Sequence, residues 1–97
     1  MRSIKEIEKR IKRNEKALQK LLPTNSVYGI LQDEIVMLRQ SLNMSENDIR
    51  ECYRQLKSIT GNIPTVYIEN IVNRNRMIVY KWLLKIKDWG EYYVKEL

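Results

Sequence analysis

Histidine is absent from this chain of 97 residues, and cysteine occurs once, as Cys52. A single cysteine cannot form a disulfide within the chain, and without histidine neither a Cys/His zinc site nor a Ser-His-Asp triad can be assembled. The sequence has only three glycines and no Gly-rich phosphate-binding loop. We therefore predict a binding or interaction protein that has no cofactor and is not an enzyme.

Long apolar runs are missing as well. No stretch approaches the roughly 18 uninterrupted apolar residues of a membrane-spanning helix, and Arg2, Lys5 and Glu6 place charges where a signal peptide would need its apolar run. We expect a cytoplasmic protein with no membrane partner. In that compartment Cys52 stays reduced, and its place on an apolar stripe indicates a small buried side chain.

Charge is plentiful and unevenly distributed. The chain carries 18 Lys and Arg against 12 Asp and Glu, a net charge of +6, and residues 1–22 hold eight positive and three negative side chains. A basic balance of this size fits an anionic partner such as nucleic acid, although soluble helical proteins often reach it without one. With 43% hydrophobic residues and only two prolines, the composition is typical of one small helix-rich domain.

Residues 1–43 show the pattern of two amphipathic helices. Apolar residues, interrupted once by an asparagine, recur at spacings of three and four at Ile4, Ile7, Ile11, Asn14, Leu18 and Leu21, and again at Tyr28, Leu31, Ile35, Leu38 and Leu42. Pro23 and the polar residues after it mark a short turn, so we expect an antiparallel helical hairpin. The basic first arm, together with Asp33 and Glu34 on the second, suits pairing between arms or between subunits.

The hairpin also has a predicted role in assembly. Asn14 is either a tolerated polar position near solvent or a residue that sets the register of an oligomer. The two stripes leave apolar surface that one copy can hardly cover, which predicts a homodimer held by residues 1–43 with Ile11 and Ile35 at the contact. A protein partner bound to residues 1–43 is the alternative.

Residues 44–97 contain a second set of helical signals. Ser45 and Asp48 resemble a capping box, which predicts a helix over residues 45–60 that closes at Gly61. The rest of the predicted order is a short extended piece, a helix over 65–72, a turn at 73–75, a helix over 75–87 with Val79 and Trp82 in the core, and a strand over 91–97. The chain as a whole is expected to be all-α or mostly α.

This order of elements is similar to the winged helix-turn-helix family. The stretch VYKWLLKIKDWG at residues 79–90 resembles the family's recognition helix running into its first wing strand. The resemblance covers residues 45–97 and implies that the helix over 75–87 enters the major groove of duplex DNA. The residues that it places at DNA are Arg74, Asn75, Arg76, Lys81, Lys85 and Lys95.

The chemistry of these side chains suits that role. Arginine can bond guanine through two N–H groups, asparagine can do the same to adenine, and lysine neutralises phosphate. On this interpretation Arg76 and Lys81 matter for DNA binding, whereas Lys9 and Lys12 on the hairpin matter less. The predicted function is a small DNA-binding transcriptional regulator whose coiled-coil-like hairpin dimerises it.

The alternative function is an all-helical adaptor that binds a protein partner and no specific DNA sequence. Met77 and Leu84 favour it, because they project roughly opposite Val79 and Ile86 and make the last helix apolar on more than one side. The sequence leaves three possible neighbours for these two side chains: DNA, the hairpin or a second subunit. If they pack on the hairpin, the whole chain is a helical bundle.

Overall fold

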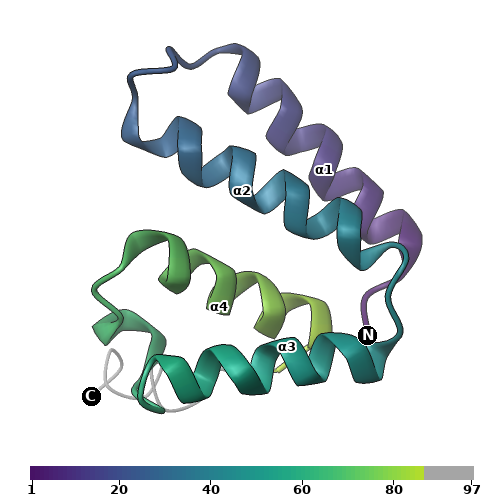
Figure 1. The fold of residues 1–97 in the computed structure, drawn as a ribbon. Coiled ribbons are helices and arrows are strands. Elements are labelled where there is room, and N and C mark those ends of the chain that lie inside the picture. The colour runs from purple at the N-terminus through teal and green to yellow at the C-terminus, as the bar shows by residue number, and fades with distance from the viewer. Residues whose placement is uncertain (87–97) are drawn as a thin grey trace, which may run out of the picture.

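The computed structural model describes residues 1–86, which fold into four α-helices and one short 3-10 helix with no strand among them (Figure 1). The elements are α1 (Ile4–Gln19), α2 (Ser26–Ser41), α3 (Glu46–Ile59), η1 (Thr65–Tyr67) and α4 (Ile71–Leu84). The expectation of a mostly helical chain is confirmed, and the strand expected over 91–97 lies outside the described residues. Within residues 1–86 no helix is both long and apolar enough to cross a membrane.

Helices α1 and α2 lie side by side and antiparallel (Figure 1). A capping box starts α1: the Ser3 hydroxyl accepts from the Glu6 backbone N–H, and the Glu6 carboxylate accepts from the Ser3 N–H. Asn25 starts α2, since its side-chain oxygen accepts from the Val27 N–H. Pro23 lies in the link between the helices, where its missing N–H costs no helical hydrogen bond.

Helix α3 begins and ends close to where the sequence predicts. The Ser45 hydroxyl accepts from the Asp48 N–H, and the Asp48 carboxylate accepts from the Ser45 N–H. After α3 the chain turns through Gly61 and Asn62, whose φ angles are 80° and 57°. Glycine takes this left-handed backbone without steric cost and asparagine tolerates it better than most residues, so the chain can turn back toward α4.

The turn expected at residues 73–75 is wrong, because α4 runs through it without a break. The Asn70 side-chain oxygen accepts from the Asn73 backbone N–H at 3.0 Å, so the helix is capped three residues before the expected turn. The separate helix expected over 65–72 is reduced to the single turn of η1. The described residues therefore contain no helix-turn-helix of the expected geometry.

The end of the last helix also differs from the expectation. Helix α4 stops at Leu84, short of the expected residue 87, and Lys85 follows it in the left-handed conformation with a φ of 56°. Its backbone N–H bonds the Trp82 carbonyl and so closes the last turn. Nothing in the sequence marks a lysine for this conformation, which glycine and asparagine favour.

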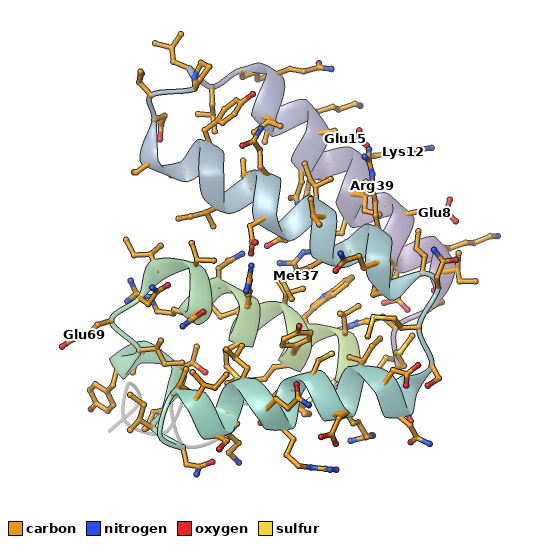
Figure 2. The ribbon with its side chains drawn as sticks, viewed as in Figure 1. Glu8, Lys12, Glu15, Met37, Arg39 and Glu69 are labelled. Atoms are coloured by element: carbon orange, nitrogen blue, oxygen red, sulfur yellow. The ribbon has the colours of Figure 1, made fainter. Side chains whose placement is uncertain are left out.

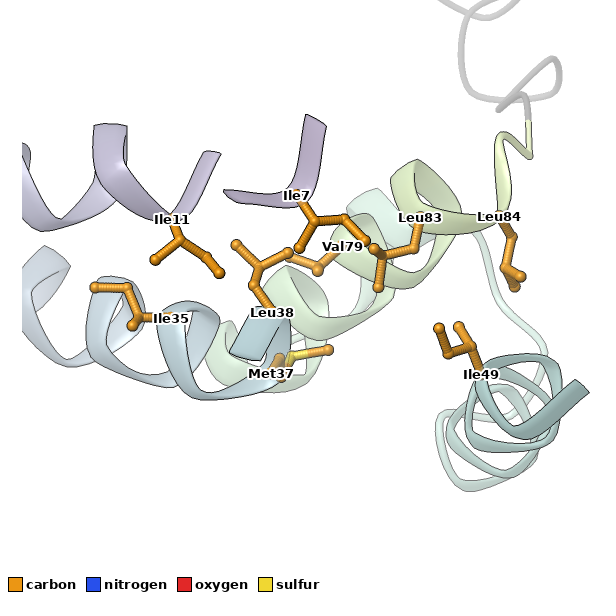
Figure 3. Packing of buried hydrophobic residues seen from close by; sticks show 9 residues of the cluster. All are labelled: Ile7, Ile11, Ile35, Met37, Leu38, Ile49, Val79, Leu83 and Leu84. Carbon is orange, nitrogen blue, oxygen red and sulfur yellow. The ribbon is translucent and has the colours of Figure 1, made fainter. Parts of the chain in front are cut away.

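One apolar core joins the hairpin to the C-terminal half (Figure 3). Its buried members come from all four α-helices and are Ile7, Ile11, Ile35, Met37, Leu38, Ile49, Val79, Leu83 and Leu84. A smaller cluster of Leu56, Ile68 and Met77 ties the residue after η1 to α3 and α4. Met77 and Leu84 are thus both buried within one chain, which makes the described part of the chain a helical bundle.

The stripes of the hairpin are covered within one chain. Ile11 and Ile35 are 6% and 7% exposed and belong to the shared core. The premise that one copy leaves these residues uncovered is therefore wrong. A substitution such as Ile11→Asp would place a charge in the core of the monomer and would not report on a dimer contact.

Leu38 tests the shared core. Its side chain is 0% exposed, so Leu38→Ala should leave a cavity and lower the free energy of unfolding by about 2–5 kcal/mol. Val36 lies on the same helix at 53% exposure, and Val36→Ala should change that free energy by less than about 0.5 kcal/mol. Urea unfolding followed by circular dichroism measures both, and equally small losses would contradict this core.

Candidate nucleic-acid interface

Two of the six residues expected at DNA are bonded to the hairpin. The Arg76 guanidinium donates to both carboxylate oxygens of Asp33 on α2, at 2.9 and 2.7 Å. These hydrogen bonds raise the pKa of Arg76 above its ordinary value. Asn75 Nδ2 donates to Glu34 Oε1 at 3.2 Å. Both side chains therefore extend from α4 toward α2.

The other expected residues of α4 and its C-cap are placed differently. Lys81 Nζ donates to Oγ1 of the buried Thr65 at 2.7 Å, which ties α4 to η1. Lys85 is exposed and Arg74 is half-buried, and their separation of eleven residues places them on the same side of the helix. Lys95 lies outside the described residues. Of the expected set within residues 1–86, Arg74, Lys81 and Lys85 share one side of α4, and only Lys85 among them is exposed.

Glu34 is the centre of a buried polar network between α1, α2 and α4. Its side chain is 6% exposed, and its two oxygens accept from the Arg10 guanidinium at 3.0 and 3.1 Å. Asn14 and Asn75 donate to the same carboxylate. Burial alone would raise the pKa of Glu34, but the hydrogen bonds from Arg10 and Asn14 and the Arg10 charge outweigh it, so the pKa falls below its ordinary 4.5.

The network explains Asn14. This residue is 5% exposed, so it does not lie near solvent, and its hydrogen-bond partner Glu34 belongs to the same chain. A shift of α1 along α2 would separate the two groups and leave a buried amide and a buried carboxylate short of partners. Asn14 therefore sets a register, between the two arms of one hairpin. Asp33 and Glu34 are both expected to pair between the arms or between subunits. Glu34 pairs with Arg10 of the other arm, whereas Asp33 pairs with Arg76 of α4.

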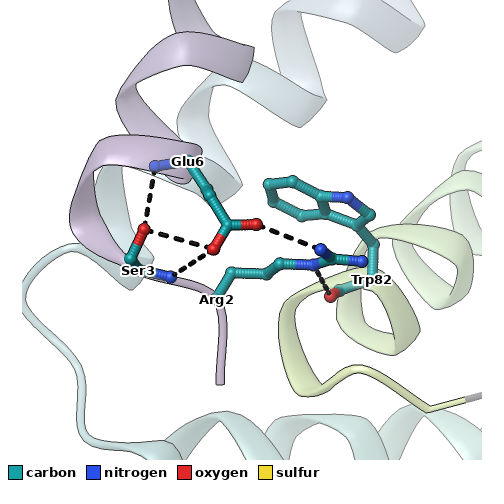
Figure 4. A network of polar contacts seen from close by, with 4 residues as sticks. All are labelled: Arg2, Ser3, Glu6 and Trp82. Carbon is teal, nitrogen blue, oxygen red and sulfur yellow. Dashed lines mark hydrogen bonds and ion pairs between the residues drawn. The ribbon is translucent and has the colours of Figure 1, made fainter.

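Trp82 lies where α4 meets the start of the chain (Figure 4). The guanidinium carbons of Arg2 and Arg10 are 4.9 and 4.6 Å from the centre of its ring, within cation–π range. Arg2 Nε also donates to the Trp82 carbonyl at 2.9 Å, and Glu6 accepts from Arg2 at 3.0 Å. Val79 is fully buried, as expected of a core residue, whereas Trp82 is only half-buried.

The outward face of α1 carries only basic residues. Opposite the core-facing Ile7, Ile11 and Leu18, the helix presents Lys5, Lys9, Lys12, Arg13, Lys16 and Lys20, which we call the α1 basic face. All six side chains are exposed, and none has an ion pair or a side-chain hydrogen bond within residues 1–86. At the rise of an α-helix this face is about 22 Å long.

Acidic side chains lie beside this face. Glu15 accepts from Arg39 of α2 at 2.9 Å, and Glu6 and Glu8 lie next to the cations (Figure 2). A shallow open depression of about 840 Å³ runs along α1 and reaches Trp82. Flexible Lys and Arg side chains form most of its lining, so it lacks the rigid apolar walls of a small-molecule site. Residues 1–86 also hold no group of His, Cys, Asp and Glu suited to a metal ion.

The sequence contains a signal for the α1 basic face that counting charges does not use. Lysines recur at intervals of three and four, the same period as the isoleucine stripe beside them, at Lys5, Lys9, Lys12, Lys16 and Lys20. The charge of residues 1–22 shows an excess of cations, and only their positions on a helical wheel show that they share one face. Lys9 and Lys12, which the sequence interpretation ranks low, lie at its centre.

Comparison of the chain with known protein families, with curated proteins and with solved structures finds no match in any of the three. The functional argument therefore depends on the geometry and the charge of the chain itself.

Glu34→Gln tests the buried network. At neutral pH we expect a loss of about 1–3 kcal/mol in the free energy of unfolding, because Arg10 loses its buried charged partner. The native pKa of Glu34 is depressed, so its contribution is complete above the unfolded-state value near 4.5 and is lost as the pH falls through the lower native value. The difference between Glu34→Gln and the unmodified chain should therefore shrink in acid.

Glu8→Gln is the matched control, because Glu8 is exposed and has no ion pair within the described residues. It should leave the free energy of unfolding nearly unchanged at either pH. Urea unfolding at neutral and at acidic pH measures both variants. A deficit of Glu34→Gln that stays constant across the two pH values would count against a charged Glu34 in the native state.

Proposed function

We propose that the protein binds duplex DNA through the phosphate backbone and that the α1 basic face makes the contact. The observation that carries the proposal is six exposed cations without ion-pair partners in the described chain, gathered on one face that holds no acidic or apolar side chain. Attraction between such a face and phosphate does not depend on base sequence and weakens as salt is added.

The composition of the α1 basic face favours a polyanion over a protein surface. Protein interfaces are depleted in lysine and have aromatic and other apolar side chains at their centre. This face consists of five lysines and one arginine. Duplex DNA carries one charge per about 1.7 Å of its axis, so a helix face about 22 Å long can meet phosphates along its whole length.

A duplex fits the surface better than a single strand. Proteins that bind single strands combine a basic groove with exposed aromatic rings on which bases stack. The α1 basic face has no aromatic residue of its own, and the one aromatic ring that lines the depression beside it, Trp82, lies against Arg2 and Arg10. The acidic side chains of Glu8 and Glu15 oppose deep entry into a groove, where both walls are phosphate. The mode of binding that remains is contact with the phosphate backbone on the outside of the duplex.

Base recognition by the helix over 75–87 is the less favoured mode. To reach DNA, Asn75 and Arg76 would have to leave Glu34 and Asp33, and Glu34 would lose part of its buried network. We therefore propose DNA binding with little sequence preference. Regulation of transcription stays a prediction from the sequence.

An adaptor that docks a protein partner on the apolar stripes of residues 1–43 is also less favoured. Those stripes are already engaged, since Ile7, Ile11, Ile35 and Leu38 lie in the core of one chain. The outer side of α1 offers a partner charge and no apolar anchor, which suits phosphate better than a protein interface.

A triple variant, Lys9→Gln with Lys12→Gln and Lys16→Gln, tests the proposal. It removes three cations from the α1 basic face and no ion pair within the described residues. The affinity for a mixed-sequence duplex should fall by about tenfold or more at low salt, and the slope of log K against log salt should become shallower by up to about 2.7. Fluorescence anisotropy over a salt series measures both quantities.

The control is Arg50→Gln with Arg54→Gln and Lys57→Gln, which removes the same net charge from the exposed side of α3 together with the ion pairs of Arg50 with Glu46 and of Arg54 with Glu51. It should cost clearly less affinity. Equal losses from the two triple variants would mean a diffuse charge effect and would reject the α1 basic face as the site. A larger loss from Arg74→Gln with Lys85→Gln, confined to one duplex sequence, would return the site to α4.

A further inference from the structure

The described residues present one surface on which several large apolar side chains are exposed. It is formed by the last turn of α3, the segment around η1 and the start of α4. Six large apolar residues there are 36–75% exposed, namely Ile59, Ile63, Val66, Tyr67, Ile71 and Val72, and we call this surface the apolar end. Residues 58–73 contain a single charged residue, Glu69, in a chain of which 31% is charged.

Neighbouring buried groups hold this surface in place. Thr65 and Ile68 are 3% and 4% exposed, and Lys81 Nζ donates to Thr65 Oγ1. The backbone N–H of Tyr67 bonds the carbonyl of Pro64 at 2.9 Å, which closes the turn. Because Thr65 and Ile68 point inward, Val66 and Tyr67 between them are turned outward.

We propose that the apolar end is the contact between two copies of this chain. Each copy carries a net charge of +6, so two copies repel each other least where charged residues are few, and residues 58–73 of this apolar surface hold only Glu69. Helix α1, which carries the basic face, lies on the far side of α2 from α3 and α4 (Figure 1). Glu69 marks the apolar end in Figure 2. Contact there keeps the two basic faces apart.

The size of the apolar end predicts a weak dimer. Six partly exposed side chains present apolar surface on the order of 500 Å², near the upper end of what a monomer leaves uncovered and below the roughly 800 Å² per partner of a standard interface. A dissociation constant in the micromolar range or above follows. Isologous pairing would place the same patch of both copies face to face, which needs no second surface.

A lipid surface fits the apolar end less well. Peripheral binding to anionic lipids combines an apolar face with basic residues beside it. In this chain residues 58–73 of the apolar end hold no lysine or arginine, and α2 lies between α1 and the α3 and α4 helices (Figure 1). A second copy requires only the apolar end.

The proposal does not depend on DNA binding, and salt separates the two. Salt weakens the attraction of α1 to phosphate. It screens the repulsion between two copies of charge +6, so the dimer should become more stable as salt rises. A salt series can be followed by fluorescence anisotropy for DNA binding and by sedimentation velocity for the dimer. It therefore tests the two proposals separately.

Sedimentation velocity of the full chain over a range of concentrations is the direct experiment. We expect a reversible monomer–dimer equilibrium. Ile59→Lys and Tyr67→Lys, made separately, should each weaken the dimer by about tenfold or more, since each places a charge in the contact. Ile59→Ser and Tyr67→Ser, which add no charge, should weaken it in the same direction.

Leu22→Lys and Val36→Lys are the matched controls, because these residues are 73% and 53% exposed and lie on the hairpin. They add the same charge and should leave the dimer nearly as stable as in the unmodified chain. Helical circular dichroism checks that every variant folds. A chain that stays monomeric at all concentrations, as it would if residues 87–97 or another protein cover the surface, overturns the proposal. Equal weakening by controls and test variants overturns it too.

Discussion

A carboxylate buried among three helices determines how this molecule is put together. Glu34 can stay charged in the interior because Arg10, Asn14 and Asn75 bond its oxygens, and these partners come from α1 and α4. Apolar contacts supply most of the stabilisation, but they are not directional and tolerate sliding. The network is directional. We interpret it as the feature that selects one register of α1 on α2 and one position of α4 against both.

The same network decides which polar groups are free to bind other molecules. Arg10 is engaged with Glu34, and Arg76 is engaged with Asp33. The acidic residues of α2 thus pair with the side of α4 that the sequence assigned to DNA, and they do not reach the outward side of α1. The lysines there remain without anionic partners in the described chain. The proposed DNA-binding surface is therefore a consequence of how the internal charges are paired.

The sequence predicts α1, α2 and α3 well because their signals are local: apolar periodicity, a proline in the first link and side-chain caps. It fails at α4 because Asn70 and Asn73 are both good capping residues, and the choice between them depends on tertiary contacts that bury Met77 and bring Asn75 to Glu34. The residues expected at DNA do not share one open surface for the same reason, because their expected roles assumed a helix that starts after a turn at residues 73–75. The α1 basic face, in contrast, can be found from the sequence alone by placing the lysines of residues 5–20 on a helical wheel.

The two proposed surfaces are coupled if both proposals hold. Phosphate that binds the α1 basic faces also neutralises the charge that keeps copies apart, so copies bound along one duplex repel each other less than free copies do. A dimer in turn presents two basic faces to one polymer and gains avidity without a new contact. By linkage, the factor by which DNA favours pairing must equal the factor by which pairing favours DNA. A chain whose α1 basic face and apolar end are formed by different segments is suited to this coupling, because neither contact uses the residues of the other.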